Sequence, residues 1–370
     1  MTNSSLELLF TGDLVLDEPN PDHWLGGIAA AIRDADVSIG HLEVPHSHRG
    51  TELKGDVPAP GADPSHIEAL RRAGFDAVSL AGNHITDLGA LGIADTRAHL
   101  AQAGIAFTGA GADLVEASTP ALVDCKGRTV GLLSFNCVGP EASWATNDRA
   151  GCAYVRIETA DGKPIAPSAR LERINEQSAR EMQQAIRTLR LRADVVIVAL
   201  HKGIVHTPAA LAPYERALSQ AAIDAGADIV IGHHAHIVRG IETYRDKPIF
   251  HGLGNGCVVT RALSPSQSHP ERAAWAKKRR ELFGFEPDPA YELAPFHPEA
   301  INAMLGRVRI DEFGRIRVGF TPVHVEAPGR PVLAQGNEAT RVIDYLRDIT
   351  TKAGLPALSI EREGEDAWLV

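Results

Sequence analysis

The segment GHHAH at residues 232–236 places three histidines within four positions, directly after an apolar run. Histidines are seldom gathered in this way for packing alone, and a neutral imidazole is a common metal ligand. In an extended segment, side chains two residues apart point to the same side. His234 and His236 would then face one site and His233 the opposite direction. We therefore expect His234 and His236 to bind a metal ion.

The same arrangement, an apolar run that ends in a metal-capable side chain, recurs along the chain. The residues concerned are Asp13, Glu43, Asn83, His84 and His201. Each motif taken alone is an ordinary turn, but ligands of open α/β sheets bind beyond the carboxyl ends of the strands. Neighbouring strands would therefore bring these side chains to one site. The mixture of imidazole, carboxylate and amide oxygen suits one or two divalent ions, such as Mn, Zn, Fe or Ca, and leaves their identity open.

Short β-rich runs alternate with amphipathic, Ala-rich segments, which is typical of the βαβ units of an α/β sheet. We predict a strand at 6–10 that ends before Asp13. The predicted helices include 23–35, 168–193 and 339–354. The turn CKGR at 125–128 predicts a hairpin, so antiparallel strands enter the fold as well.

Residues 260–300 differ from the rest because proline, charged and aromatic residues are concentrated there. Such a composition is typical of a functional insertion or lid rather than of a core. We expect a single domain over residues 1–370, with a lid or insertion at 260–300. His297 lies in this segment and is a candidate catalytic residue, with an ordinary surface histidine beside Pro298 as the alternative.

The composition limits the classes of partner. Of the 370 residues, 44% are hydrophobic, which indicates a globular protein, and the net charge of −10 argues against nucleic-acid binding. We expect no membrane span and no signal peptide, and hence a cytoplasmic protein, with its four cysteines as free thiols. The oligomeric state stays open.

The order and spacing of the motifs resemble the CapA family, which is named for poly-γ-glutamate capsule biosynthesis and is similar to the calcineurin-like metallophosphoesterases. The motifs are TGD at Asp13, HLE at Glu43, GNH followed by Asp87 and Gly89, HKG at His201, GHHAH at 232–236 and LGN at Asn255. The resemblance implies a four-layer αββα sandwich. It also implies a two-metal pocket lined by Asp13, Glu43, Asn83, His201, His234 and His236. Glu43 would stand where the phosphoesterases place a bridging aspartate, and His84 would contact the substrate or leaving group.

The chain also departs from the family pattern. His41 stands where the family has Asn, Lys202 where it has Trp, and Val205 where it has Glu. Asp13 is followed by Leu14 and Val15, so the D-x-H histidine of the phosphoesterases is missing. Compared with the phosphoesterases, the predicted site therefore lacks one imidazole ligand.

Three functions remain open. The preferred one is a metal-dependent enzyme that acts on a peptide or amide-linked amino-acid substrate, by inverting a Cα centre, as the resemblance to the lasso-peptide epimerase type implies, or by hydrolysis. Inversion needs two proton carriers on opposite faces, and Asp13 and His297 are the candidates. The alternatives are a two-metal phosphoester hydrolase and a non-catalytic metal-binding component of poly-γ-glutamate or capsule synthesis.

Overall fold

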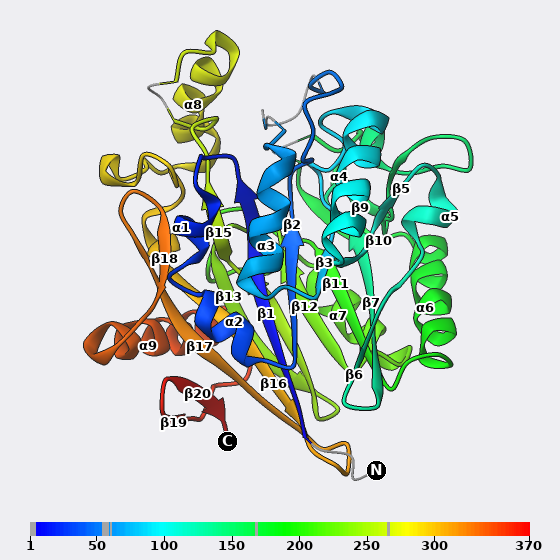
Figure 1. Ribbon diagram of the computed structural model, residues 1–370, viewed down its shortest axis with the longest axis vertical. Helices are drawn as coiled ribbons and strands as arrows, with labels where there is room; N and C mark the ends of the chain where they lie inside the picture. Colours follow the sequence, from blue (N-terminus) through cyan, green and yellow to red (C-terminus); the bar gives the residue numbers. More distant parts are fainter. Residues whose placement is uncertain (1–4, 54–58, 60, 167–168, 265–266) are drawn as a thin grey trace.

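The computed structural model of the chain describes residues 5–53, 59, 61–166, 169–264 and 267–370 (Figure 1). Two large sheets pack face to face. The first has the strand order β19-β20-β17-β16-β1-β2-β3-β4, with β15 also paired to β1 and β18 to β17. The second has the order β13-β14-β12-β11-β7-β6, and two small sheets join β9 to β10 and β5 to β8.

The strands of the first sheet are β1 Leu6–Leu16, β2 Val37–Leu42, β3 Ala77–Ser79, β4 Ala106–Thr108, β15 Asn255–Val259, β16 Asn302–Ile310, β17 Ile316–Glu326, β18 Arg330–Leu333, β19 Ile360–Glu363 and β20 Asp366–Leu369. Those of the second are β6 Ala121–Cys125, β7 Arg128–Asn136, β11 Val195–His201, β12 Ile229–His233, β13 Val238–Tyr244 and β14 Lys247–Leu253. The small sheets comprise β5 Ala110–Gly111, β8 Gly151–Cys152, β9 Ile157–Thr159 and β10 Leu171–Ile174.

The α-helices are α1 Pro21–Leu25, α2 Ala29–Asp34, α3 Ile67–Ala73, α4 Gly89–Ala103, α5 Leu114–Ala117, α6 Glu176–Arg190, α7 Glu215–Asp224, α8 Pro270–Phe283 and α9 Gly336–Lys352. Short 3-10 helices are η1 Pro64–His66, η2 Glu141–Ser143, η3 Pro289–Tyr291 and η4 Pro298–Ile301. In the part of the chain that the structure describes, no helix is long and apolar enough to cross a membrane.

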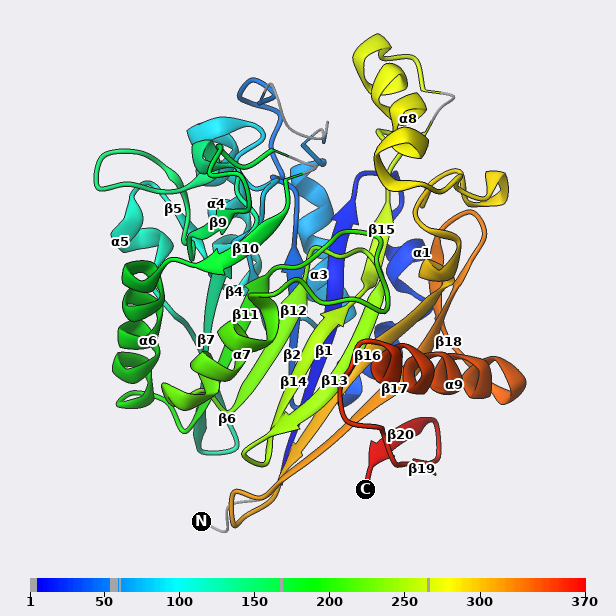
Figure 2. The ribbon, with the colours of Figure 1, turned by 180° about the vertical axis from the view of Figure 1, so that it is seen from behind.

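The layers follow the order helix, sheet, sheet, helix. Helices α1 to α4 cover the outer face of the first sheet, and α6 and α7 cover the second (Figures 1 and 2). Between the sheets, Phe10 of β1 shares a buried apolar core with Ile197 of β11 and Ile231 of β12. The predicted four-layer αββα sandwich is confirmed by this arrangement.

Strand β1 shows how the sequence builds two of these interfaces at once. Before residue 11, Leu8 and Phe10 face the core between the sheets, whereas Leu9 faces the helices. After a register shift around Asp13, the even-numbered Leu14 and Leu16 face the helices instead. A β-bulge exchanges the faces in this way, because side chains alternate with a period of two. The prediction that the strand ends before Asp13 is therefore wrong: β1 continues through it.

Two predicted helices have different bounds. The segment 23–35 contains the end of α1 and the whole of α2, and in the turn between them Gly27 packs so closely on β18 that a Cβ there would lie 2.2 Å from Pro331 O. In 168–193, the first described part forms β10 and the helix begins only after Asn175, whose side chain accepts a hydrogen bond from Ser178 N–H as an N-cap. The hairpin at 125–128 and the last helix are confirmed.

The described part of 260–300 is dominated by α8 and by the irregular chain that follows it, while residues 265 and 266 lie outside the described residues. In Figures 1 and 2, α8 stands at the end of the molecule toward which β1 and β2 point. The four cysteines are free thiols, and three of them, Cys137, Cys152 and Cys257, are buried.

Candidate metal centre

The strand registers bring the candidate residues to one place. In the first sheet, Asp13 of β1 lies opposite His41 of β2 on one side and opposite Asn255 of β15 on the other. In the second sheet, His201 is the last residue of β11 and lies opposite His233 of β12. The bulged middle of β1 and the start of β15 therefore meet the carboxyl ends of β2, β11 and β12, so that both sheets contribute to the candidate site.

One group of side chains consists of Asp13, Glu43 and His236, whose ligand atoms all lie within 4.8 Å of one another. His236 Nδ1 is 3.4 Å from Asp13 Oδ2, and its Nε2 is 3.3 Å from Glu43 Oε1. Asn255 Oδ1 lies 3.0 Å from the same Nδ1. Two carboxylates and an imidazole thus converge on a space that an ion could occupy.

A second group consists of Asp13, His41 and His201, again with ligand atoms within 4.8 Å. His41 Nδ1 is 2.9 Å from Ser79 Oγ, a contact that orients the ring. His201 Nε2 is 2.8 Å from Asn83 Oδ1. Asp13, rather than Glu43, is common to both groups, so Asp13 is the residue that two ions would share if each group held one.

His234 completes the cluster from the side of the second group. Its ring centroid lies 4.8 Å from that of His201, and its backbone N–H is directed at Asp13 Oδ1 at 3.4 Å. The expected extended geometry is wrong, however: β12 ends at His233, and φ is 86° at His234 and 52° at His236. His233 is in neither ligand group: its Nε2 lies 3.3 Å from Thr11 O, and its ring stacks on that of His41 with centroids 4.8 Å apart. Left-handed backbone, not strand alternation, therefore brings His234 and His236 to one site.

The unsatisfied polar atoms of the cluster fit a metal ion. The buried side-chain atoms that have no hydrogen-bond partner among the described residues include Asp13 Oδ2, both Glu43 carboxylate oxygens, His41 Nε2, His201 Nδ1 and His234 Nδ1. Buried polar atoms are normally paired, so this concentration of lone pairs is costly unless a cation binds them. The donor set of imidazole and carboxylate is compatible with divalent metal binding.

The pKa values of the cluster divide: those of Asp13 and His236 are raised, whereas those of Glu43, His41 and His234 are lowered. Burial, reinforced by the charge of Glu43, raises the pKa of Asp13 well above its usual value. Burial opposes ionisation of Glu43 too, but the positive charge of His236 outweighs it and lowers the pKa of Glu43 to about 2, and the charge of Glu43 in turn raises the pKa of His236 to about 9 against the effect of burial. Burial lowers the pKa of His41 to about 4 and that of His234 to about 3, which keeps both imidazoles in the neutral form that metals bind.

A cavity of about 600 Å³ opens beside the cluster. The polar wall that it shares with the candidate centre consists of Asn83, His84, His234 and His236. His84 is held by Asp87, whose Oδ2 lies 2.8 Å from His84 Nδ1. The remaining wall is mostly apolar, and the segment 260–300 contributes Leu263, Trp275, Arg279, Leu282, Phe283 and Phe296 to it. A volume of this size suits a small ligand or the end of a larger one.

Two histidines near the cluster were not predicted from the sequence as site residues. His41 is fully buried in the second group, and the sequence marked it only as a departure from the family motif, two residues before Glu43. His206 lines the cavity with its ring 6.0 Å from that of His236 and 4.9 Å from that of Phe283. Its φ of 55° in an irregular loop gave no periodic pattern to detect.

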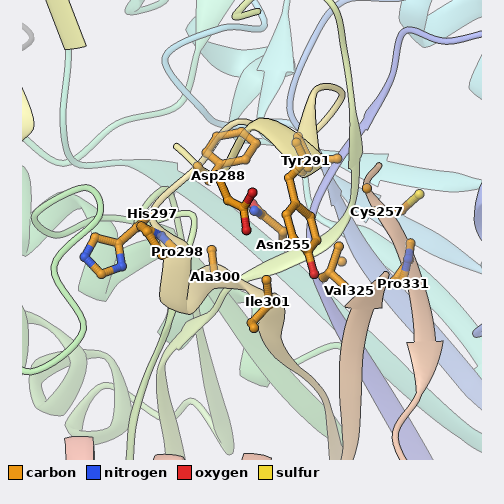
Figure 3. A pocket seen from close by; sticks show the side chains of 15 residues that line it. Asn255, Cys257, Asp288, Tyr291, His297, Pro298, Ala300, Ile301, Val325 and Pro331 are labelled. Carbon is orange, nitrogen blue, oxygen red and sulfur yellow. The ribbon is translucent and has the colours of Figure 1, made fainter. Parts of the chain in front are cut away.

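The structure does not bring His297 to the other candidates. His297 lines a separate, small cavity of about 20 Å³, and in Figure 3 its ring points away from Asn255 and Tyr291. Its Nδ1 accepts a hydrogen bond from Glu299 N–H, and its ring lies 5.2 Å from that of Phe285. Asp13 and His297 therefore do not face each other across the 600 Å³ cavity.

The comparisons with known proteins agree with the motif order. A family model described as bacterial capsule synthesis protein PGA_cap matches residues 7–258, more than half of the chain. The chain belongs to the PGA_cap family. The CapA resemblance predicted from the sequence is thereby confirmed.

Two curated PGA_cap-like relatives illustrate the degree of similarity. The capsule biosynthesis protein CapA of Bacillus anthracis is 26% identical, over 68% of this chain and 60% of its own length. A protein of Mycobacterium tuberculosis, named as a probable polyglutamine synthesis accessory protein, is 33% identical over 63% of this chain and 59% of its own. The chain thus spans about 60% of the length of these relatives.

Two solved structures are similar at low identity. The calcineurin-like phosphoesterase YfkN from Bacillus subtilis is 12% identical with a TM-score of 0.41, and the match covers 94% of this chain and 99% of that one. A sulfate thiohydrolase SoxB, solved in complex with glycerol, is 11% identical with a TM-score of 0.41, covering 95% of this chain and 61% of that one. At these TM-scores the likeness says nothing about activity.

The structure shows where two residues that depart from the family motifs, Lys202 and Val205, lie in this PGA_cap member. Lys202 is fully buried, with its Nζ 3.1 Å from Glu215 Oε2 and 3.2 Å from His251 Nδ1. Arg239 Nη1 donates to the same Glu215 carboxylate at 3.1 Å. Lys202 therefore belongs to a buried ionic network behind the cluster, whereas Val205 lines the cavity.

Proposed function

We propose that this PGA_cap protein is a divalent-metal-dependent enzyme that acts on a peptide or another amide-linked amino-acid substrate. The observation that carries the proposal is the composition of the 600 Å³ cavity, whose polar wall is part of the candidate centre and whose other walls are largely apolar and aromatic. Apolar walls suit amino-acid side chains, and the polar wall suits a carbonyl group that reacts.

In this proposal, Asp13, Glu43 and His236 hold one ion. Asp13, His41 and His201 hold a second, with Asn83 and His234 beside them, so that Asp13 is shared. His41 would then supply the imidazole that the missing D-x-H histidine supplies in phosphoesterases. When bound, a divalent ion supplies a Lewis acid that polarises a carbonyl oxygen.

The residues of the chain provide for two reactions at such a carbonyl. In Cα inversion, a base takes the α-proton, the electron pair moves toward the carbonyl, and a proton returns to the opposite face; in hydrolysis, water adds and the amine leaves. His84, which lines the cavity and is oriented by Asp87, is better placed than His297 to carry a proton. Asp13, predicted from the sequence as the other proton carrier, is a metal ligand in this proposal and does not line the cavity, so the second proton carrier stays unassigned.

The names of the relatives support the proposed substrate class. They refer to capsule biosynthesis and to polyglutamine synthesis, and a chain of amide-linked glutamine residues is a polymer of the proposed kind. The net charge of −10 supports a partner other than nucleic acid. We further propose that the segment 260–300 acts as the cover of the cavity, because it supplies much of the apolar wall.

The direct test is incubation of the purified, manganese-loaded protein in D2O with short N-acetylated peptides, followed by mass spectrometry and chiral analysis. A gain of one dalton with inversion indicates epimerisation, and shorter products indicate hydrolysis. Either change should be lost in His84→Asn and kept in His46→Asn, a buried histidine that is not part of either ligand group. If no peptide changes, the proposal is wrong.

Phosphoester hydrolysis is the second candidate, because two ligand groups that share Asp13 would also suit a two-metal phosphoesterase. Turnover of an aryl phosphodiester with added manganese, without any change in peptides, would favour it. The word accessory in the name of the mycobacterial relative favours a third, non-catalytic role. Metal binding without turnover of either substrate class would support that role.

A further inference from the structure

Arg279 of α8 is a buried cation in the wall of the cavity. Arg279 is only 2% exposed, and it lines the same 600 Å³ cavity as His234 and His236. The guanidinium stacks over Phe285 at 5.9 Å and over Phe296 at 5.7 Å, and its Nη1 lies 3.5 Å from Leu263 O. The planar cation is therefore held in place by two rings and a backbone carbonyl.

Within the described part of the chain, no acid forms an ion pair with this cation. Among the described residues that line the cavity there is neither an aspartate nor a glutamate. Burial lowers the pKa of Arg279 to about 10, and no neighbouring carboxylate acts in the opposite direction. Since a buried charge is costly unless it is paired, a guanidinium in this state favours an anionic ligand.

The second arginine of the described cavity wall is in a different condition. Arg170 also lines the space, but its side chain is 77% exposed and its Nη2 lies 2.9 Å from Glu172 Oε1. An exposed, paired arginine gains little from a further anion, because water and its partner already stabilise it. Of these two arginines, Arg279 is thus the buried one without an acidic partner among the described residues, and Arg170 provides a matched control.

We propose that Arg279 binds the terminal carboxylate of the substrate, which is an N-acylated amino acid or peptide that ends in an apolar residue. The carboxylate would pair with the guanidinium fork, and the apolar side chain would lie against Phe283, Phe296 and Trp275. The group that reacts would then face His234 and His236. The reaction of this substrate rests on the proposed function, whereas its binding at Arg279 does not.

The apolar walls decide between two sources of a carboxylate. The α-carboxylate of a chain end can be accompanied by an apolar side chain, which suits the aromatic surroundings of Arg279. A side-chain carboxylate of an acidic polymer brings amide groups on both sides, which the apolar wall cannot pair. The structure therefore favours a chain end over an internal acidic residue.

Calorimetry with three small probes tests the proposal: N-acetyl-L-phenylalanine, its amide, and N-acetyl-L-glutamate α-amide. We expect the free acid to bind about 10- to 100-fold more tightly than either amide, as is typical of a charge-assisted hydrogen bond. Arg279→Gln should abolish this preference, Arg279→Lys should keep part of it, and Arg170→Gln should leave it unchanged. Thermal unfolding of each variant serves as the folding control. Equal affinity of wild type for acid and amide, or an unchanged preference in Arg279→Gln, overturns the proposal.

A second series, in which a chelator removes metal from wild type and from each variant, separates this proposal from the proposed function. One possible result is that chelation removes the preference for the acid while Arg279→Gln keeps it. The carboxylate then binds at the candidate centre, and the Arg279 subsite is wrong, while the proposed function stands. The other possible result is that Arg279→Gln removes the preference while chelation keeps it. If in addition no peptide is converted in D2O, the subsite stands and the proposed function fails.

Discussion

His41 is the residue whose role depends most on the three-dimensional structure. It stands in the first sheet opposite Asp13, its Nδ1 faces Ser79, and its buried Nε2 has no partner among the described residues. Gly82 leaves room for it, because a Cβ there would lie 2.9 Å from His41 Nε2. The ligand atoms of His41, Asp13 and His201 all lie within 4.8 Å of one another, and this proximity favours a ligand role; His46 also has an unpaired Nε2 but lies outside both ligand groups.

We predict that His41→Asn weakens metal binding at one position only. Titration of chelator-treated protein with Mn²⁺ should show about two ions per wild-type chain. In the variant, one of the two should bind at least about 10-fold more weakly, because an imidazole ligand is lost.

His46→Asn is the control for that prediction. His46 is equally buried, and its Nδ1 lies 3.2 Å from Val44 O, outside both ligand groups. A change that is the same in both variants would show that His41 acts through stability and not as a ligand.

At the scale of elements, the bulge in β1 is what places Asp13. The strand passes so close to the loop before β15 that a Cβ at Gly12 would lie 1.8 Å from Gly254 O. Asp13 N–H donates to that same Gly254 O at 3.0 Å. The absence of a side chain at Gly12 thus allows the approach that fixes the position of Asp13.

We predict that Gly12→Ala lowers the free energy of unfolding by about 2 kcal/mol or more, because the clash is with backbone and cannot be relieved by a side-chain rotation. It should also weaken Mn²⁺ binding, since Asp13 must move. Urea unfolding and calorimetry measure the two effects. Gly306→Ala is the comparison, because its nearest atom is Leu253 Cδ2 at 3.1 Å, which can move; equal effects would contradict the account.

The elements also show what the sequence could and could not predict. The hairpin at 125–128 and the last helix have local signals, a turn with residues of positive φ and a strong apolar period, and both were predicted. The positive φ values of His234 and His236 have no such signal, because neither residue is a glycine. The start of α6 after Asn175 does have a signal, the N-cap, which the high charge of the segment obscured.

At the scale of the molecule, buried charges behind the candidate centre link the second sheet to α7. Glu215 of α7 accepts from Lys202 Nζ and Arg239 Nη1, each at 3.1 Å, and all three side chains are fully buried. Burial opposes ionisation of Glu215, but the charges of Lys202 and Arg239 outweigh it and lower its pKa to about 2. His251 adds to this effect.

We predict that Glu215→Gln lowers the free energy of unfolding by about 3–5 kcal/mol at pH 7, because two buried cations lose their counter-ion. The folded pKa of Glu215 lies below the unfolded value near 4.5, so its contribution is present above pH 4.5 and is lost as the pH falls toward 2. The difference between wild type and variant should therefore shrink over that range in urea unfolding.

Glu176→Gln is the matched control, since Glu176 and Arg180 form an exposed pair and the change should have almost no effect. A difference between wild type and Glu215→Gln that is independent of pH would show that the carboxylate is not held ionised by its neighbours.

The whole-molecule arrangement explains why the candidate residues could be identified from the sequence but their geometry could not. Their positions at strand ends are local facts, and the motif order led to the αββα sandwich and the family. The ligand groups combine residues from two different sheets, and only the packing of one sheet on the other shows that Asp13 is common to both groups. It also places His297, an attractive candidate by composition, in a different cavity.

The measurement that tests the central claim most directly is anomalous scattering from crystals grown with Mn²⁺. The account predicts two peaks of density that flank the Asp13 carboxylate, one beside Glu43 and His236 and the other beside His41 and His201. A map with no peak at Asp13, or with ions bound only elsewhere, would contradict it.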